Sequence, residues 1–455
     1  MNRCSSFFFL LLLTVLFAGT AAAEKGQFKL ASFSADVTIP IGHRCMGVLP
    51  TKSKKIVDRL YVHGFVLLGG GKPIVFTAVD WCEIRNGAYD QWRDALAKAA
   101  GTVRQRVLVS SLHQHDAPVT DSGAARLLRD QGLKNELYDE RFHADTIKRV
   151  SAALKISLRS AKLVTHLGLG QAKVKQIASN RRVILANGRV SYGRSSSAGR
   201  SKFHREAADG LIDPYLKTIS FWNGKKPLLA MHSYATHPMS YYGRGEVTSD
   251  FVGLARERRQ RDDFSVKQVY FSGCSGDVTA GKYNDGSHDR RLILVKRLYQ
   301  GMVAAWKNTK LVPLSTIGFR NTQLDLEFHP SPKLTKKSLQ SRLRNKKLKV
   351  ETRILAAMGL SSRLRVAARQ KIDFPCVDLG AAQIILFPGE SFVGYQLMAQ
   401  KMRPKSFVFS IGYGECWPGY IPTKSNFDDG FGESWLWVAA SSEKRIRAAL
   451  GRVLK

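Results

Sequence analysis

The chain has 455 residues, of which 44% are hydrophobic, and its formal net charge is +35. This hydrophobic content is sufficient for a buried core, and the six cysteines are scattered, which excludes a disulfide-framework protein. The excess of Lys and Arg favours an anionic partner such as phospholipid headgroups, lipopolysaccharide, acidic polysaccharide or nucleic acid, without indicating a specific nucleic-acid site. Solubility alone also explains such a charge.

The N-terminus has the pattern of a secretory signal peptide. Arg3 precedes an apolar run over residues 7–18, and three small alanines end at Ala23 before polar Glu24. The apolar run is shorter than the ~18 residues that a membrane span needs, which favours a cleaved signal over an anchor. We therefore expect cleavage near Ala23 and a secreted or periplasmic protein that comprises residues 24–455.

Strand-like and helical segments alternate along the rest of the chain. Apolar runs recur at residues 66–68, 74–79, 107–109, 216–221, 228–231, 269–271, 383–387 and 407–411, and residues 89–100 and 144–159 have helical character. This interleaving predicts an α/β fold with a large mixed sheet flanked by helices. We expect a single large domain over residues 24–455.

Residues 333–371 differ from their surroundings. They are dense in Lys and Arg and carry Leu and Ile at helical spacing, which predicts one or two basic amphipathic helices within the domain. Such helices can contact a membrane surface or another polyanion. A solvated helix packed on the domain is the commoner outcome of this pattern.

Five polar motifs each follow an apolar run, and we expect them to meet in one site. They are His113-Gln-His115, the segment from His232 to His237, the small-residue loop 272–279, Pro388-Gly-Glu390 and the segment 412–423. Side chains alternate along a strand, so His113 and His115 point the same way. Ligands of α/β sheets bind beyond the carboxyl ends of the strands. The exposed N–H groups of loop 272–279 also suit an anion-binding nest.

Each motif taken alone has an ordinary structural explanation. A histidine near a strand end is usually a hydrogen-bonded structural residue, and Glu390 suits the first turn of a helix. Tyr420 lies in a turn where aromatic residues commonly pack, and Asp277 can cap its loop. Only the convergence of the motifs favours a functional site.

In their order along the chain, these motifs and two others resemble those of the neutral, non-lysosomal ceramidases and related secreted hydrolases. The resemblance extends from about residue 31 to residue 423. The matching segments are Asp36-Val-Thr-Ile-Pro-Ile-Gly42, Leu112-His-Gln-His-Asp-Ala-Pro118, Tyr234-Ala-Thr-His-Pro-Met239, Ser249-Asp-Phe-Val-Gly253, Gly276-Asp-Val-Thr-Ala280, Pro388-Gly-Glu390 and Trp417-Pro-Gly-Tyr-Ile-Pro-Thr423.

The resemblance implies a ceramidase-like catalytic domain with a zinc site, without the immunoglobulin-like C-terminal domain of those enzymes. The implied zinc ligands are His113, His237, Glu390 and Tyr420. Two imidazoles, a carboxylate and a phenolate are acceptable zinc ligands and leave room for a water molecule.

The resemblance also implies roles for residues beside the metal. His115 becomes the acid/base residue, Arg181 lies near the substrate, and Asp277 orients groups around the metal. Thr279 stands where the family has a catalytic serine, and Trp417 replaces the first aromatic residue of the tyrosine motif.

The implied activity is metal-assisted hydrolysis of an N-acyl amide bond in a ceramide-like sphingolipid or another acyl amide. Two alternatives remain open at this point. One is a hydrolase of esters or other amides in envelope components. The other is a non-catalytic protein that binds a polyanion or the cell surface on the same scaffold.

Overall fold

A computed structural model describes residues 27–199 and 201–455 of the protein. The signal peptide predicted over residues 1–23 lies outside these residues and stays a prediction. All five cysteines beyond residue 26 are buried and unpaired. In the described part of the chain, no helix combines the length and the apolar composition that a bilayer crossing requires.

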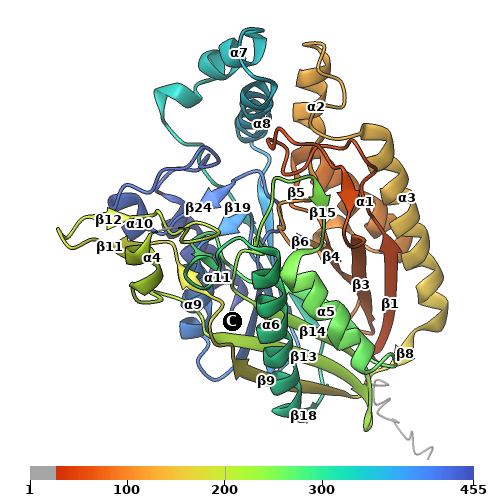
Figure 1. Ribbon diagram of the computed structural model, residues 1–455. Coiled ribbons are helices and arrows are strands. Elements are labelled where there is room, and N and C mark those ends of the chain that lie inside the picture. The colour runs from red at the N-terminus through yellow and green to blue at the C-terminus, as the bar shows by residue number, and fades with distance from the viewer. Residues whose placement is uncertain (1–26, 200) are drawn as a thin grey trace, which may run out of the picture.

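Three large sheets form the framework (Figure 1). The first contains, in spatial order, β6 (Val107–Ser111), β4 (Ile74–Val79), β3 (Tyr61–Leu68), β1 (Lys29–Asp36) and β8 (Lys162–Leu163). The second contains β16 (Lys267–Ser272), β14 (Lys226–Tyr234), β13 (Tyr215–Asn223), β9 (His166–Lys173) and β18 (Lys310–Pro313). The third contains β19 (Gly318–Leu324), β20 (Ile372–Asp378), β21 (Ala382–Leu386) and β23 (Phe407–Ile411).

Each large sheet contains one parallel pair of strands beside its antiparallel pairs. The parallel pairs are β4–β6, β14–β16 and β21–β23. A parallel pair needs a crossover, and here a helix supplies each one: α1 (Asn86–Ala100), α5 (Asp250–Asp262) and α9 (Val393–Met402). Every residue of β4, β6 and β21 is buried, as expected for strands that are covered on both faces.

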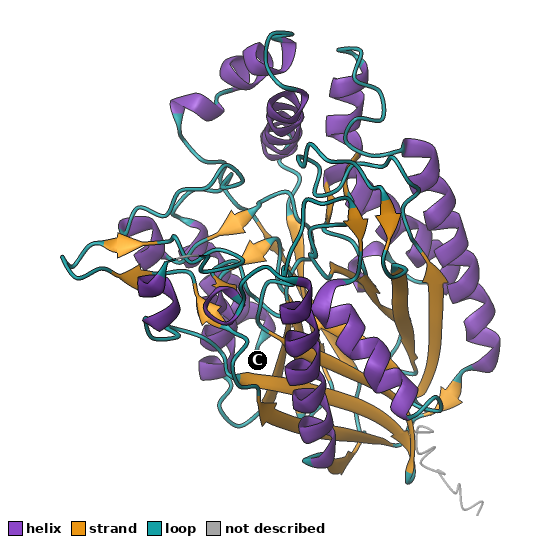
Figure 2. Cartoon of the chain, in the orientation of Figure 1, coloured by secondary structure: helices purple, strands orange, loops and turns teal. Residues whose placement is uncertain are grey.

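A second helix packs beside each crossover helix. These helices are α3 (Glu140–Ser157) beside α1, α6 (His288–Lys307) beside α5, and α11 (Ser442–Val453) beside α9. Figure 2 shows the helices outside and the strands inside. The predicted α/β class with mixed sheets is therefore confirmed, and the mixed pairing is distributed over three large sheets.

One apolar cluster joins the three sheets. It includes Phe76 from the first sheet, Phe221 from the second and Phe409 from the third, all fully buried. The rings of Phe65 and Phe221 lie 5.5 Å apart and connect the first two sheets directly. Burial of this apolar surface is the main term that holds the sheets together.

The remaining elements are short or peripheral. The basic residues 333–371 form two helices, α7 (Lys336–Arg344) and α8 (Val350–Ala367). The predicted amphipathic pattern holds for α7, whereas α8 is buried at consecutive positions from Ala356 to Ser362 because other elements cover it on several sides. The other helices are α2 (Ser122–Arg129), α4 (Lys202–Glu206) and α10 (Lys424–Asp428). The short strands are β2 (Lys55–Ile56), β5 (Glu83–Arg85), β7 (Val119–Asp121), β10 (Ser179–Asn180), β11 (Val183–Ile184), β12 (Val190–Ser191), β15 (Glu246–Val247), β17 (Val278–Thr279), β22 (Glu390–Ser391) and β24 (Tyr420–Ile421).

A buried ion pair connects the second large sheet to the first. The guanidinium of Arg256, on α5, donates to both carboxylate oxygens of Asp80 at 2.7 and 2.8 Å, and both side chains are buried. Asp80 follows β4 and also accepts a hydrogen bond from the backbone N–H of Tyr61. Arg256 therefore joins a helix of the second sheet to the end of a strand of the first.

We expect Arg256→Ala to lower the free energy of unfolding by about 3–5 kcal/mol, because it leaves the Asp80 carboxylate buried without its cation. Chemical denaturation measures this loss. The matched control is Arg261→Ala on the same helix, where the side chain is exposed. Equal stability of the two variants would show that the ion pair contributes nothing.

Candidate metal centre

The four predicted metal ligands come from three sheets and lie together. His113 follows β6, His237 follows β14 and Glu390 follows β21, so each stands beyond the carboxyl end of a strand of a parallel pair. Tyr420 lies opposite Glu390 in the parallel pairing of β22 with β24. The fold thus brings together residues that are separated by up to about 300 positions in the sequence.

Both histidines direct their Nε2 atoms at one carboxylate oxygen. The Oε2 atom of Glu390 lies 3.0 Å from Nε2 of His237 and 3.3 Å from Nε2 of His113. The opposite ring nitrogens contact backbone carbonyls: Nδ1 of His113 lies 3.0 Å from the oxygen of Cys82, and Nδ1 of His237 lies 2.5 Å from that of Ser275.

These contacts fix the tautomers of the two rings. A carbonyl only accepts hydrogen bonds, so each Nδ1 carries its proton, and the Nε2 atom of a neutral ring then presents a lone pair. Two lone pairs and a carboxylate oxygen consequently face one another in a buried space, which requires a cation or additional protons between them. Burial raises the pKa of Glu390, but His113 and His237 outweigh it and hold that pKa well below its usual range.

Tyr413 contacts His113 directly and His237 through Ser275. Its ring stacks on that of His113 at 4.3 Å with an interplanar angle of 18°. Its hydroxyl lies 2.8 Å from Oγ of Ser275, whose carbonyl holds His237. His113 and Tyr413 both have positive φ angles, 73° and 53°, in the region that non-glycine residues rarely adopt. This backbone strain lies at the cluster itself, as it often does at functional sites.

Tyr420 is held by Arg181. Nη1 of Arg181 donates to the phenol oxygen at 3.1 Å, and Nη2 pairs with Glu433 at 2.6 Å. Burial, followed by the charge of Glu390, raises the pKa of Tyr420 well above its usual value, although Arg181 opposes the shift. The phenol is therefore neutral without a further cation, so its use as a phenolate ligand depends on one.

His115 lies beside the cluster with an unused nitrogen. One ligand atom each from His113, His115 and His237 falls within 4.8 Å of the others. Among the described residues, nothing hydrogen-bonds Nδ1 of buried His115. Burial, and then the charges of His113 and His237, lowers the pKa of His115 well below its usual value. A neutral imidazole with a free nitrogen at this point suits proton transfer.

Asp277 contacts the segments that carry Glu390 and Arg181. Its carboxylate accepts from the N–H of Val393, at the start of α9, and from the side-chain amide of Asn180, both at 2.8 Å. Burial raises its pKa to about 6, and these hydrogen bonds oppose the shift. The backbone N–H of Arg181 donates to the carbonyl of Asp277 at 2.7 Å. Asp277 thus links the segment of Glu390 to that of Arg181.

Thr279 uses its hydroxyl in backbone contacts. Oγ1 donates to the carbonyl of Ser195 at 2.8 Å and accepts from the N–H of Gly281 at 3.0 Å. The expected anion-binding nest is also largely occupied, because four N–H groups of the loop donate to other protein groups: those of Gly273, Cys274, Gly276 and Val278. The catalytic role of Thr279 stays a prediction.

The structure adds an acidic residue that the sequence analysis missed. Glu83 is the first residue of β5, shortly after β4 ends at Val79. Its Oε1 atom lies 3.9 Å from Nδ1 of His113 with no hydrogen-bond partner among the described residues. Its Oε2 accepts from fully buried Arg85 at 2.7 Å. Burial raises the pKa of Glu83 to about 7, although Arg85 opposes the shift. The position of Glu83 just beyond an apolar strand was the available signal.

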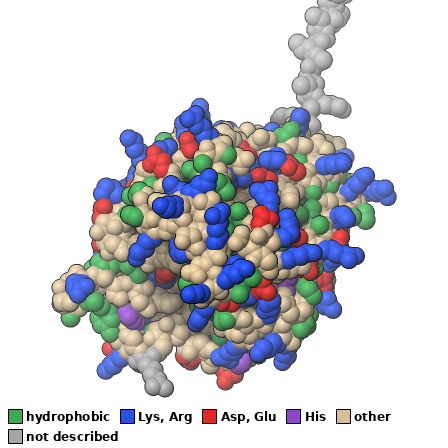
Figure 3. All heavy atoms as spheres, turned by 90° about the horizontal axis from the view of Figure 1, so that it is seen from above, with side chains coloured by type: hydrophobic (Ala, Val, Ile, Leu, Met, Phe, Trp, Pro, Cys, Tyr) green, Lys and Arg blue, Asp and Glu red, His purple; other side chains and the backbone are tan. Residues whose placement is uncertain are grey.

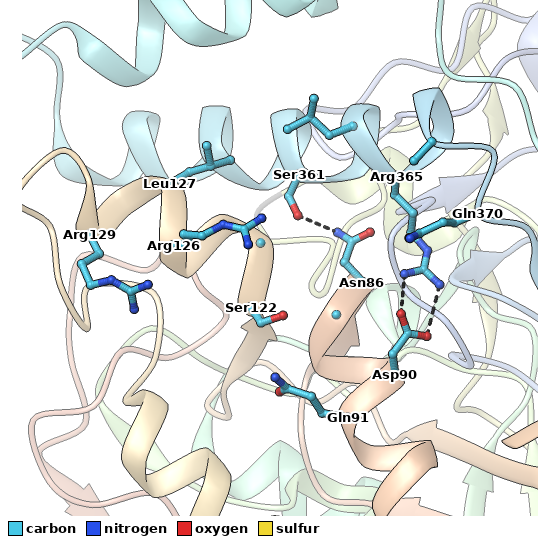
Figure 4. A pocket seen from close by; sticks show the side chains of 14 residues that line it. Asn86, Asp90, Gln91, Ser122, Arg126, Leu127, Arg129, Ser361, Arg365 and Gln370 are labelled. Carbon is cyan, nitrogen blue, oxygen red and sulfur yellow. Dashed lines mark hydrogen bonds and ion pairs between the residues drawn. The ribbon is translucent and has the colours of Figure 1, made fainter.

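A polar network leads from Glu83 to a cavity of about 480 Å³ between α1, α2 and α8 (Figure 4). Arg85 lies 3.8 Å from Asp121, which accepts from Nδ2 of Asn86 at 2.6 Å. Asn86 lines the cavity together with Arg365, which pairs with Asp90. None of the four predicted ligands is among the described residues that line it.

Two solved structures are similar to this chain. A ceramidase complexed with C2 aligns at a TM-score of 0.66 and 14% identity, over 94% of this chain and 75% of that one. The neutral ceramidase from Pseudomonas aeruginosa aligns at a TM-score of 0.67 and 14% identity, over 94% of this chain and 74% of that one. No protein-family model and no curated protein matches the chain. The chain therefore has the ceramidase fold over nearly its whole described length, as the motifs predict.

Proposed function

We propose that this protein is a secreted zinc-dependent hydrolase that cleaves N-acyl amide bonds. The observation that supports it best is the meeting of two Nε2 lone pairs and the Glu390 carboxylate at one buried point. Secretion is proposed from the N-terminal signal pattern, and the substrate class from the ceramidase fold.

The residues at this point suit zinc. His113, His237, Glu390 and Tyr420 would hold the ion, since imidazole nitrogens and carboxylate oxygens are among its common protein ligands. When bound, zinc lowers the pKa of a water molecule to about 7 and polarises a scissile carbonyl. Arg181 keeps the phenol of Tyr420 oriented toward the cluster throughout.

Proton transfer falls to His115 in this proposal. Its neutral ring has a free Nδ1 beside the ligands, so it can accept a proton from the attacking water and return it to the leaving amine. Arg181 contacts the ligand Tyr420 through one side-chain nitrogen and Glu433 through another. In this proposal its guanidinium also donates to the carbonyl oxygen of the substrate as that oxygen gains negative charge.

Metal analysis is the first test. We expect about one zinc ion per purified wild-type chain and a loss of that ion in His113→Ala or His237→Ala, because each removes a ligand. Elemental analysis after gel filtration measures the content. His204→Ala, in the peripheral helix α4, is the control that should retain zinc. A fully loaded His237→Ala protein would contradict the ligand assignment.

The reaction is tested with paired substrates. We expect wild-type protein to hydrolyse N-acyl amides of a long-chain amino alcohol, and His115→Ala to lose about 10²–10⁴-fold in turnover at unchanged zinc content. Matched acyl esters in the same assay discriminate between amide and ester hydrolysis. Unreduced turnover in His115→Ala would exclude this histidine as the proton carrier, and a zinc-loaded protein without activity on either class would contradict the proposed enzyme.

Glu83 is expected to position His113 through the Nδ1 side of the ring. Loss of an outer partner of a histidine ligand typically lowers metal affinity by about 10–100-fold, so we expect that change in Glu83→Gln. Competition with a chelator measures the zinc affinity. The control is Glu415→Gln, which alters another buried acid that pairs with Arg365 at 3.4 Å. Equal zinc affinities in the two variants would show that Glu83 has only a structural role.

A further inference from the structure

Residues 333–349, called here the basic segment, concentrate positive charge at one place. They contain eight basic residues and no acidic residue. Seven of the eight are exposed: Lys333, Lys336, Lys337, Arg344, Lys346, Lys347 and Lys349. The basic segment lies at one extremity of the molecule, where α7 projects at the top of Figure 1. Figure 3 shows this face from above, with Lys and Arg side chains outnumbering acidic ones.

The basic segment is held in place by its apolar side. Leu339 and Leu343, one turn apart on α7, are buried in the core that also contains α8. Arg363 on α8 donates to the carbonyl of Leu334 and fixes the turn that precedes α7. The apolar face of the helix is thus used for packing, and its charged face remains turned outward.

Neighbouring acids leave this charge uncompensated. Glu351, the next acid along the chain, pairs with Arg44 at 2.8 Å. Glu433, which faces α7 across a groove, pairs with Arg181 at 2.6 Å. Within the part of the chain that the structure describes, none of the eight basic side chains makes an ion pair, so their charge is available to an external anion.

An apolar groove lies directly beside these cations. Its volume is about 590 Å³, and its walls include Leu334, Leu355, Leu436 and Trp437. Lys333 and Arg342 of the basic segment also line it. This volume is within the range of about 300–1,000 Å³ that is typical of small-molecule sites, so the groove is large enough for an acyl chain.

We propose that the basic segment docks the protein on an anionic phospholipid bilayer, with phosphate headgroups against its Lys and Arg side chains and one acyl chain in the groove. Stable attachment to a membrane surface commonly needs both a polybasic patch and an inserted apolar group. A soluble polyanion would use the cations and leave the groove empty, so the pairing of the two features favours lipid. This inference goes beyond the proposed hydrolase, because binding to vesicles requires no catalysis.

Sedimentation with vesicles tests the proposal. We expect wild-type protein to bind vesicles of phosphatidylcholine mixed with phosphatidylglycerol, to bind pure phosphatidylcholine vesicles much less, and to dissociate as salt rises. The quadruple variant Lys336→Glu, Lys337→Glu, Lys346→Glu and Lys347→Glu should bind the mixed vesicles at least about 100-fold more weakly.

A matched control separates local docking from net charge. The substitutions Lys225→Glu, Lys226→Glu, Lys307→Glu and Lys310→Glu make the same change in charge at exposed positions near the opposite end of the molecule. This control should bind like the wild type. Circular dichroism and thermal melting verify that both variants are folded. The proposal would be overturned if both quadruple variants lost vesicle binding equally, or if the variant in the basic segment bound vesicles like the wild type.

The groove is tested separately by filling it. Ser434 is an exposed residue of the lining, so Ser434→Trp places an indole in the groove without disturbing the core. We expect this variant to bind mixed vesicles about tenfold more weakly. Its binding to immobilised heparin should not change. Two outcomes would contradict lipid docking and indicate a soluble polyanion as the partner. One is vesicle binding by Ser434→Trp that equals that of the wild type, and the other is wild-type binding to heparin that is as strong as its binding to vesicles.

Discussion

The meeting of three acceptor atoms in a buried space is the constraint on which the rest of the site depends. With each Nδ1 committed to a carbonyl, the Nε2 atoms of neutral His113 and His237 and the Oε2 atom of Glu390 all face one another as acceptors. Their proximity at about 3 Å in a low dielectric is costly unless a cation or additional protons lie between them. The stacking of Tyr413 on His113 and the carbonyls of Cys82 and Ser275 hold the two rings in this arrangement.

The fold produces this arrangement with three βαβ units, one in each large sheet. Each large sheet contributes a βαβ unit, and the carboxyl ends of its two parallel strands point at the same region. Six strand ends result, and five of them carry the polar motifs found in the sequence. The sixth is the end of β4, and the short strand β5 that comes soon after it begins with Glu83 beside His113. The rule that ligands bind beyond the carboxyl ends of parallel strands thus accounts for both the predicted residues and the one that was missed.

The sequence predicted the α/β class, one or two basic helices and the convergence of five polar motifs, because apolar runs and the polar residues that follow them are local patterns. The set of four ligand residues came from the resemblance to the ceramidases. The sequence could not predict Tyr413, whose stacking on His113 depends on two sheets coming together. Nor could it predict the positive φ of His113, which lies beyond the end of β6 and not on the strand that the alternation argument assumed. The expected nest in loop 272–279 failed for the same reason: its N–H groups are used by Tyr234, Gln396 and Ser391, from distant segments.

The net charge and the site are separate features of this molecule. Near the ligands, Arg181 is balanced by Glu433 and Arg85 by Glu83, so the interior gains little from the overall excess of cations. Part of the excess lies in the basic segment, which holds eight Lys and Arg residues and no acidic residue. Glu433 connects the two regions, since it lines the groove and also holds the arginine that donates to Tyr420. The groove and the ligand cluster are therefore linked through one ion pair, that of Glu433 with Arg181.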